Sequence, residues 1–242
     1  TGDSSFIRIW NANSGRDIRS INVSNLIISL QFSPDSRYVA AATSDRSIKV
    51  WETLTGRQIQ SIPGVDGPVV FSPNGRRIAT GSPFLWAPGT PGFGFRETAR
   101  IFDRSTGQAI MELRGHSSAV TSIAYSPDGL RIVTGSNDRT ARVWNTTDGR
   151  EVAVLRGHTD TVTSVAFSPD GRTIATGSDD QTARIWNASD GSVLTVLNGH
   201  HEGITSVAFS PDGHQVITGS RDSTARVWDT IANRDYITLN TE

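Results

Sequence analysis

The sequence predicts an all-β protein with the architecture of a β-propeller. A stretch of 42 residues, 158–199, recurs with 24 identities at 116–157 and with 20 identities at 200–241. Each copy holds four short segments rich in β-branched and aromatic residues, separated by turn residues. Repeats of about 20–50 residues indicate solenoids, propellers or arrays, and four antiparallel strands per repeat are typical of a propeller blade.

The turns of the unit 158–199 define its strands. Ser168-Pro169-Asp170-Gly171 is a tight turn, because Pro presets φ at its second position and Gly accepts a positive φ at its fourth. Two further turn clusters follow at 178–181 and 187–191. The unit is therefore expected to contain four strands, at 161–167, 173–177, 182–186 and 192–197.

Aligning the units on their aromatic residues extends the repeat over the whole chain. The third strand is marked by Trp10, Trp51, Phe102, Trp144, Trp186 and Trp228, whereas the Ser-Pro-Asp/Asn turn occurs only five times. We expect one domain, 1–242, of about six blades and 22 strands, in which the first blade is only partly encoded. The expected units are a half blade at 1–22 and blades at 23–63, 64–115, 116–157, 158–199 and 200–242.

An incomplete ring leaves strand edges open, which favours self-association through those edges. Because the chain starts with Thr1 inside a repeat, we interpret it as part of a longer protein whose ring has six or seven blades. The net charge is −1, so nothing in the overall charge favours nucleic acid or an anionic membrane. There is no cysteine and no apolar run of the length of a membrane span. We expect a cytoplasmic protein, or a nuclear one in a eukaryote.

Several recurring motifs resemble those of the WD-repeat (WD40) β-propeller family. Gly157-His158, the turn at Ser168, Thr176-Gly177-Ser178, Asp180 and Ile185-Trp186-Asn187 stand where that family places its motifs. The Trp-Asp pair itself is kept only at Trp228-Asp229. The resemblance covers essentially the whole chain and implies a WD40-type propeller that acts in protein interactions.

The resemblance also implies that the repeated polar residues are structural. In the family, a His, a Ser, an Asp and a Trp form a hydrogen-bonded chain within a blade, so we expect neither a metal site nor a catalytic group among them. A buried imidazole, hydroxyl and indole each need a partner. The residues concerned are His116, Ser136, Asp138 and Trp144; His158, Ser178, Asp180 and Trp186; and His200, Ser220, Asp222 and Trp228.

Two blades depart from this set. The second keeps Thr43, Asp45 and Trp51 but has Val23 at the histidine position, and the third has Phe102 for Trp and a lead-in at 63–67 that is three residues shorter. We expect these blades to be less stable than the others and to depend on their neighbours.

The third unit also carries an insertion, 82–97, that breaks the repeat. It contains Phe84, Leu85, Trp86, Phe93 and Phe95 in a stretch rich in Pro and Gly. One interpretation is structural, with the loop covering an imperfect blade. The other is recognition, because aromatic side chains concentrate binding energy at interfaces.

Further recognition positions follow from the resemblance. In the family, the residues three and five after the His and the residue before the Asp line the face that contacts partners. The matching positions here are Ala119, Thr121 and Asn137; Thr161, Thr163 and Asp179; Gly203, Thr205 and Arg221; and Leu26, Ile28 and Ser44. This mixture of apolar, small and oppositely charged side chains suits a peptide or a protein, whereas a phosphate backbone calls for clustered Lys and Arg.

The leading hypothesis is a non-catalytic scaffold or sensor module within a larger signalling or regulatory protein, with a protein or peptide partner and no cofactor. One alternative is a propeller hydrolase, for which Asp66, Glu97 and Glu202 are the aperiodic carboxylates available. Another alternative is a set of equivalent small-molecule or glycan sites repeated on the blades.

Overall fold

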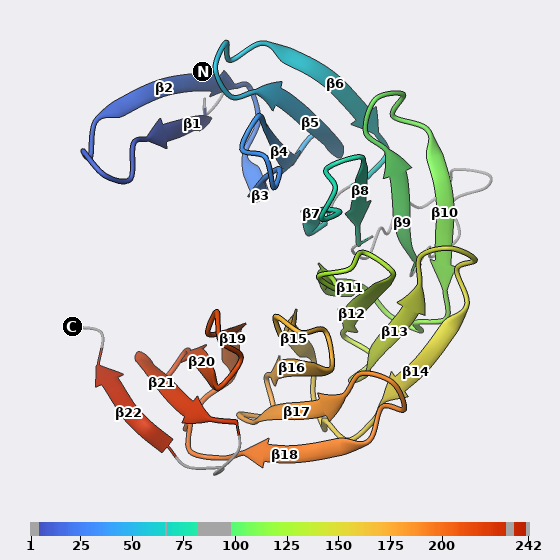
Figure 1. Cartoon of the computed structure of the whole chain (residues 1–242), viewed down its shortest axis with the longest axis vertical. Helices are drawn as coiled ribbons and strands as arrows, with labels where there is room; N and C mark the ends of the chain where they lie inside the picture. The colour runs from blue at the N-terminus through green and yellow to red at the C-terminus, as the bar shows by residue number, and fades with distance from the viewer. Residues whose placement is uncertain (1–4, 66, 82–97, 231–234, 241–242) are drawn as a thin grey trace.

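The computed structural model describes residues 5–65, 67–81, 98–230 and 235–240. These residues form 22 strands and no helix, so the all-β prediction is confirmed. The strands build one two-stranded and five four-stranded antiparallel sheets, arranged in a ring that stays open between the first sheet and the last (Figure 1). Among the described residues, no helix is long and apolar enough to cross a bilayer.

Each sheet is a run of consecutive strands, and blade 1 has only two of them, β1 (Ser5–Trp10) and β2 (Asp17–Val23). Blades 2 and 3 consist of β3 (Ile27–Phe32), β4 (Tyr38–Thr43), β5 (Ser47–Glu52), β6 (Gln58–Pro63), β7 (Val69–Phe71), β8 (Arg77–Thr80), β9 (Thr98–Asp103) and β10 (Ala109–Arg114). Blade 4 consists of β11 (Val120–Tyr125), β12 (Arg131–Ser136), β13 (Ala141–Asn145) and β14 (Glu151–Leu155). Blades 5 and 6 consist of β15 (Val162–Phe167), β16 (Thr173–Ser178), β17 (Ala183–Asn187), β18 (Val193–Leu197), β19 (Ile204–Phe209), β20 (Gln215–Ser220), β21 (Thr224–Asp229) and β22 (Asp235–Asn240).

In blades 2 to 6 the hairpin between the first two strands is fixed by its Ser-Pro-Asp or Ser-Pro-Asn turn. In blade 5, Ser168 Oγ donates to Asp170 Oδ1 at 2.6 Å, and the same carboxylate oxygen accepts the backbone N–H of Arg172 at 3.0 Å. Gly171 has φ of 69°. A residue with a Cβ disfavours that conformation, which explains the glycine at the fourth turn position.

The hydrophobic core is divided between the blades rather than gathered in one place. At each junction the aromatic residue of one blade is buried among aliphatic side chains of the blade before it. Trp186, for example, packs with Val133, Val143 and Leu155 of blade 4. Trp228 packs in the same way on blade 5, Trp144 on blade 3 and Trp51 on blade 1.

Hydrogen bonds near the ring axis add a second link between neighbouring blades. Ser122 Oγ accepts the backbone N–H of Val165 at 3.1 Å, and Ser164 Oγ accepts that of Val207 at 3.1 Å. These bonds fix the position of each blade along the ring axis relative to its neighbour. The loops that join the second and third strands of the blades therefore lie on one common face of the ring.

Candidate interaction face

The repeated histidine, aspartate and tryptophan meet inside each of the last three blades. In blade 5, His158 Nδ1 lies 2.8 Å from Asp180 Oδ2, and His158 Nε2 lies 2.7 Å from Thr176 Oγ1. Trp186 Nε1 donates to the same Thr176 hydroxyl at 2.8 Å. With the imidazole proton on Nδ1, the ring donates to the carboxylate and accepts from the threonine, so the imidazole, the threonine hydroxyl and the indole N–H all have partners.

This geometry corrects the assignment of Ser136, Ser178 and Ser220. The hydroxyl between the histidine and the tryptophan belongs to a threonine that precedes each of these serines by two residues. These threonines are Thr134, Thr176 and Thr218. The physical reason is the register of the two strands: Thr176 pairs with Arg184 and is therefore the diagonal neighbour of Trp186, whereas Ser178 lies at the end of β16, two residues further from the tryptophan. Ser178 Oγ instead accepts the backbone N–H of Asp180 at 3.1 Å and donates to Asp160 O.

The aspartate holds the turn between the second and third strands. Asp138 Oδ1 accepts from the hydroxyl of Thr140 at 2.6 Å, and its Oδ2 accepts the backbone N–H of Ser117 at 3.0 Å. Burial opposes ionisation of Asp138, but the hydrogen bonds from His116 and Thr140 outweigh it and hold the pKa of the carboxyl well below its usual range. The pKa values of Asp180 and Asp222 are lowered in the same way.

The three histidine side chains are fully buried, each in its own blade. No group of three His, Cys, Asp or Glu side chains in the described part of the chain could hold a metal ion. Of the three carboxylates weighed for hydrolysis, Asp66 and Glu97 lie outside the described residues, and Glu202 is exposed. The buried chain of hydrogen bonds therefore offers a rigid support for the loops above it, not a site that a ligand can reach.

In blades 2 and 3, other residues replace parts of this hydrogen-bonded set. In blade 2, Lys49 Nζ contacts Asp45 Oδ2 at 2.6 Å, while Val23 is buried where the last three blades have histidine. Burial opposes ionisation of Asp45, yet hydrogen bonds led by that from Lys49 lower its pKa to about 2. In blade 3, Phe102 is buried among residues of blade 2, and the Thr80 hydroxyl turns to Gly81 O at 2.8 Å.

A groove opens on the loop face where the repeat is shortened. It has a volume of about 550 Å³ and spans blades 2, 3 and 4. The short strand β7 has three residues, whereas β3 and β11 have six each, so blade 3 leaves space between its neighbours. The lining residues are Ile28, Ser29, Gly67, Pro68, Ala119, Val120, Thr121 and Asn137.

Four of the sequence-predicted face positions meet in this groove. Ile28 is 53 % exposed on one wall, and Ala119, Thr121 and Asn137 form the opposite wall. Part of the wall is fixed by backbone pairing, since Asn137 N–H donates to Ala119 O at 3.0 Å. The Thr121 hydroxyl donates to Val162 O of the next blade, which leaves only its lone pairs for a ligand.

The other predicted positions lie elsewhere on this face. Asp179 and Arg221 form an ion pair at 2.8 Å and largely neutralise each other. The Thr163 hydroxyl donates to Ile204 O and Gly177 O, and that of Thr205 donates to Gly219 O. Leu26 is exposed and pairs by its backbone with Ser44. Phe84, Leu85, Trp86, Phe93 and Phe95 lie outside the described residues.

Sequence reasoning missed Ser29, Gly67, Pro68 and Val120 as groove residues. The signal was present in the shortened lead-in at 63–67, which we interpreted only as a source of instability. Gly81 also belongs to this region, because a Cβ there would lie 2.8 Å from Val120 O. The close approach of the two backbones requires glycine at that position.

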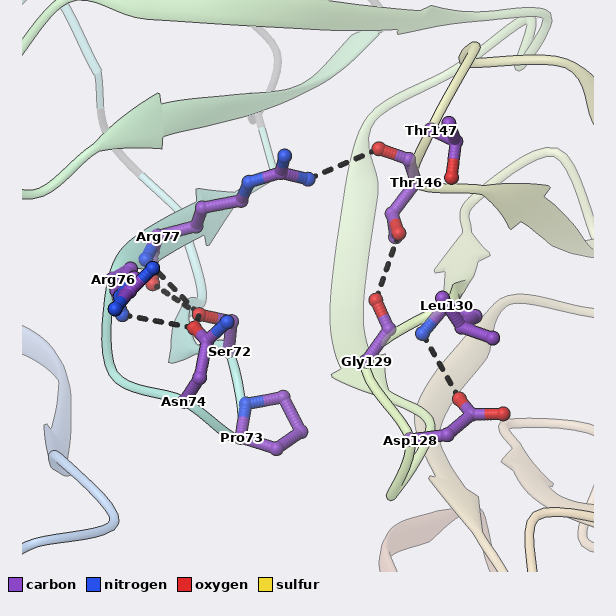
Figure 2. Close-up of a pocket in the computed structure, with 10 residues that line it drawn as sticks. All are labelled: Ser72, Pro73, Asn74, Arg76, Arg77, Asp128, Gly129, Leu130, Thr146 and Thr147. Carbon is purple, nitrogen blue, oxygen red and sulfur yellow. Dashed lines mark hydrogen bonds between the residues drawn. The ribbon is translucent and has the colours of Figure 1, made fainter.

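The opposite face carries a more polar depression of about 510 Å³ between blades 3 and 4 (Figure 2). Arg77 Nη1 donates to Thr146 O at 3.0 Å, and the Thr146 hydroxyl donates to Gly129 O at 2.7 Å. A depression of the same volume lies at the equivalent place between blades 5 and 6. Because it recurs with the repeat and its polar groups bond to one another, we interpret it as part of the architecture.

Comparison with known proteins agrees with these observations. The family described as "WD domain, G-beta repeat" matches residues 15–52, 107–145, 149–187 and 191–229, which together make up more than half of the chain. The chain belongs to the WD-repeat family. The matched segments include the tryptophans of the last three blades, whose hydrogen-bonded chains are described above, and Trp51 of blade 2.

Similar curated proteins come from a plant and from Dictyostelium discoideum. The chain is 29 % identical over 147 residues to WD repeat-containing protein VIP3 of Arabidopsis thaliana, covering 53 % of this chain and 42 % of that protein. It is 30 % identical over 135 residues to the serine-threonine kinase receptor-associated protein of Dictyostelium discoideum, covering 54 % and 41 %. It is also 27 % identical over 175 residues to autophagy-related protein 16 of Arabidopsis thaliana, covering 57 % and 34 %. The matched region thus spans less than half the length of these relatives.

Proposed function

We propose that this WD-repeat chain is a non-catalytic interaction module that binds an extended peptide segment of a protein partner in the groove over blade 3. The groove is the observation that carries the proposal. It lies on the loop face where blade 3 departs from the repeat, and the exposed Ile28 meets polar side chains there.

The chemistry of the groove defines the ligand. None of its lining residues is charged, so the partner needs no cluster of opposite charge. Ile28 and Pro68 provide apolar surface for a large side chain, while the Asn137 amide provides a donor and an acceptor for a peptide backbone. Its volume lies within the range of about 300–1,000 Å³ that is usual for ligand sites.

The relatives support an interaction role. The name of the Dictyostelium discoideum protein states that it is associated with a kinase receptor. Since the relatives are longer than the region matched, we place this module within a larger regulatory protein of the cytoplasm or nucleus. This assignment to a larger protein is an addition to the proposal, for which the groove is the supporting observation.

The test is selection of displayed 12-residue random peptides on the immobilised 242-residue chain. The selected peptides are expected to share a large apolar residue, to bind once per chain in a calorimetric titration, and to lose at least about tenfold in affinity for Ile28→Asp, because a buried charge opposes an apolar contact. Leu130→Asp is the matched control, since Leu130 is equally exposed on the other face.

Three outcomes would contradict the proposal. Peptides that bind Ile28→Asp as well as the wild type would show that the groove is not the site. A stoichiometry of about one ligand per blade would favour repeated sites instead. A failure of every peptide to be enriched would show that the groove does not bind extended peptides.

A further inference from the structure

The outermost strand of each blade has one unpaired edge, which lies on the outer rim of the ring (Figure 1). Such an edge can pair with another extended chain, and proteins often block it with charged residues or proline. Charged residues occur in β2, β10, β14 and β22, and β6 ends at Pro63. By contrast, β18 has the sequence VLTVL, in which Val193 is 48 % and Leu194 is 54 % exposed. Among the outermost strands that the structure describes, β18 alone has neither kind of protection.

Blade 5 also has an arginine that lacks the carboxylate partner of its counterpart in blade 4. There, Arg142 Nη1 pairs with Glu151 Oε2 at 2.5 Å, and Glu151 stands opposite Trp144 at the start of β14. The equivalent residues of blade 5 are Arg184 and Val193, so an apolar side chain replaces the carboxylate. Within the described part of the chain, the guanidinium of Arg184 has no carboxylate partner and no hydrogen bond, although its Nε is buried.

The guanidinium of Arg184 is nevertheless held in the same place as its counterpart. A Cβ on Gly157 would lie 2.6 Å from Arg184 Nη1. The corresponding distance in blade 4, from a Cβ on Gly115 to Arg142 Nη1, is 2.7 Å. The carboxylate of Glu151 lies beside the same glycine, since that Cβ would be 3.4 Å from Glu151 Oε2. The repeat therefore shows where a carboxylate must lie to pair with Arg184.

The carboxylates of blade 5 are engaged elsewhere and leave the charge of Arg184 uncompensated. Arg156 precedes Gly157, so it adds a second positive charge beside Arg184, and it too has no carboxylate partner in the described ranges. The carboxylates of Asp160, Asp170, Asp179, Asp180 and Asp190 bond to Thr161, Ser168, Arg221, His158 and Ser192, respectively.

We propose that the outer edge of blade 5 binds an extended acidic segment of a partner protein, which adds to the sheet as a fifth strand beside β18. Backbone hydrogen bonds to the free edge supply affinity, and alternate side chains supply specificity. One Asp or Glu of the segment pairs with Arg184, because a guanidinium forms strong charge-assisted hydrogen bonds with a carboxylate. The added strand lies two strand spacings, about 9.5 Å, from β17, and the long side chains of an arginine and a glutamate together bridge that span.

A second copy of this chain is a poorer occupant of the edge. Two β18 strands paired with each other bring two Arg184 side chains into one interface and supply no carboxylate between them. Like charges in such an interface oppose association. The occupant therefore carries its own negative charge. The rim is also separate from the groove over blade 3, so the two sites can be tested independently.

Selection of displayed 12-residue random peptides on the folded Ile28→Asp chain tests the proposal, because that variant does not depend on binding in the groove. Enriched peptides are expected to combine β-branched or aromatic residues with at least one Asp or Glu. Their binding is expected to slow hydrogen exchange of the backbone amides in β18. Replacing the acidic residue of a peptide by its amide should weaken binding at least about tenfold, as for the loss of a hydrogen bond between charged groups.

Two substitutions in the chain remove the free guanidinium in different ways. Arg184→Gln deletes it, whereas Val193→Glu restores in blade 5 the ion pair that blade 4 makes between Arg142 and Glu151. Each is expected to weaken binding of the acidic peptide at least about tenfold, with the fold checked by circular dichroism. Val193→Gln is the matched control, since it has the size of glutamate without the charge, and it is expected to bind like its parent.

Four results would overturn the proposal. The first is equal affinity of an enriched peptide for Val193→Glu and Val193→Gln. The second is binding that leaves hydrogen exchange in β18 unchanged, and the third is a selection that enriches no acidic peptide. The fourth is self-association of the wild-type chain in sedimentation velocity that Val193→Glu abolishes, which would assign the edge to a second copy.

Discussion

Thr176 is the residue on which the hydrogen-bonded chain of blade 5 depends, and Thr176→Val tests this directly. Valine keeps the shape of the side chain but removes the hydroxyl that accepts from Trp186 Nε1 and donates to His158 Nε2. Both side chains are buried, so Trp186 Nε1 and His158 Nε2 each lose their hydrogen-bond partner. An orphaned buried polar group costs about 1–3 kcal/mol, and the two together are expected to lower the free energy of unfolding by about 2–6 kcal/mol.

Thr80→Val is the matched control for that measurement. Thr80 holds the same strand position in blade 3, but among the described residues its hydroxyl bonds only to Gly81 O, since Phe102 replaces the tryptophan. Its loss is expected to cost no more than about 1.5 kcal/mol. Urea denaturation, with hydrogen exchange to locate the effect in blade 5, measures both variants. Equal destabilisation by the two substitutions, or less than 1 kcal/mol (roughly the value of one ordinary bond) for Thr176→Val, would refute the reasoning.

Two further predictions concern the blades and their carboxylates. The pKa of Asp180 is lowered by folding, so its contribution to stability is fully present above its ordinary value of 3.8 and is lost as the pH falls through the folded pKa. Melting curves should therefore show a gap between wild type and Asp180→Asn that is largest near neutral pH and narrows below about pH 4; a gap that widens on acidification would contradict this sign. Phe102→Ala should lower the free energy of unfolding by about 3–5 kcal/mol, because it empties the pocket of blade 2. A loss below 1 kcal/mol in a urea titration, less than is usual for a buried Phe, would show that the pocket collapses around the alanine.

Most of the fold can be predicted from the 42-residue repeat. A period of 42 residues with turn residues at fixed places predicted the strands of blade 5 within one residue of their observed ends, because turn chemistry is local. The expected fourth strand of the last unit is β22. Local patterns predict such elements well when every unit repeats the same solution.

The details of the site could not be predicted from the sequence, because they depend on how the strands pair and how the blades pack. Thr176 and Ser178 are two residues apart and recur together, so the sequence alone does not tell which hydroxyl faces the tryptophan; the pairing of β16 with β17 decides it. The groove is formed by residues more than 100 positions apart, Ile28 and Asn137, across a shortened β7. The shortening was visible in the sequence, but its effect on the neighbouring blades was not.

The central claim is that the repeated residues support the fold while the groove over blade 3 recognises a partner. Calorimetric affinity of a selected peptide, measured on Ile28→Asp and on Thr176→Val below its melting temperature, tests both halves at once. We predict at least about tenfold weaker binding with unchanged stability for Ile28→Asp, and unchanged binding with lower stability for Thr176→Val. Unchanged binding to Ile28→Asp, together with lost binding to a folded Thr176→Val, would contradict the account.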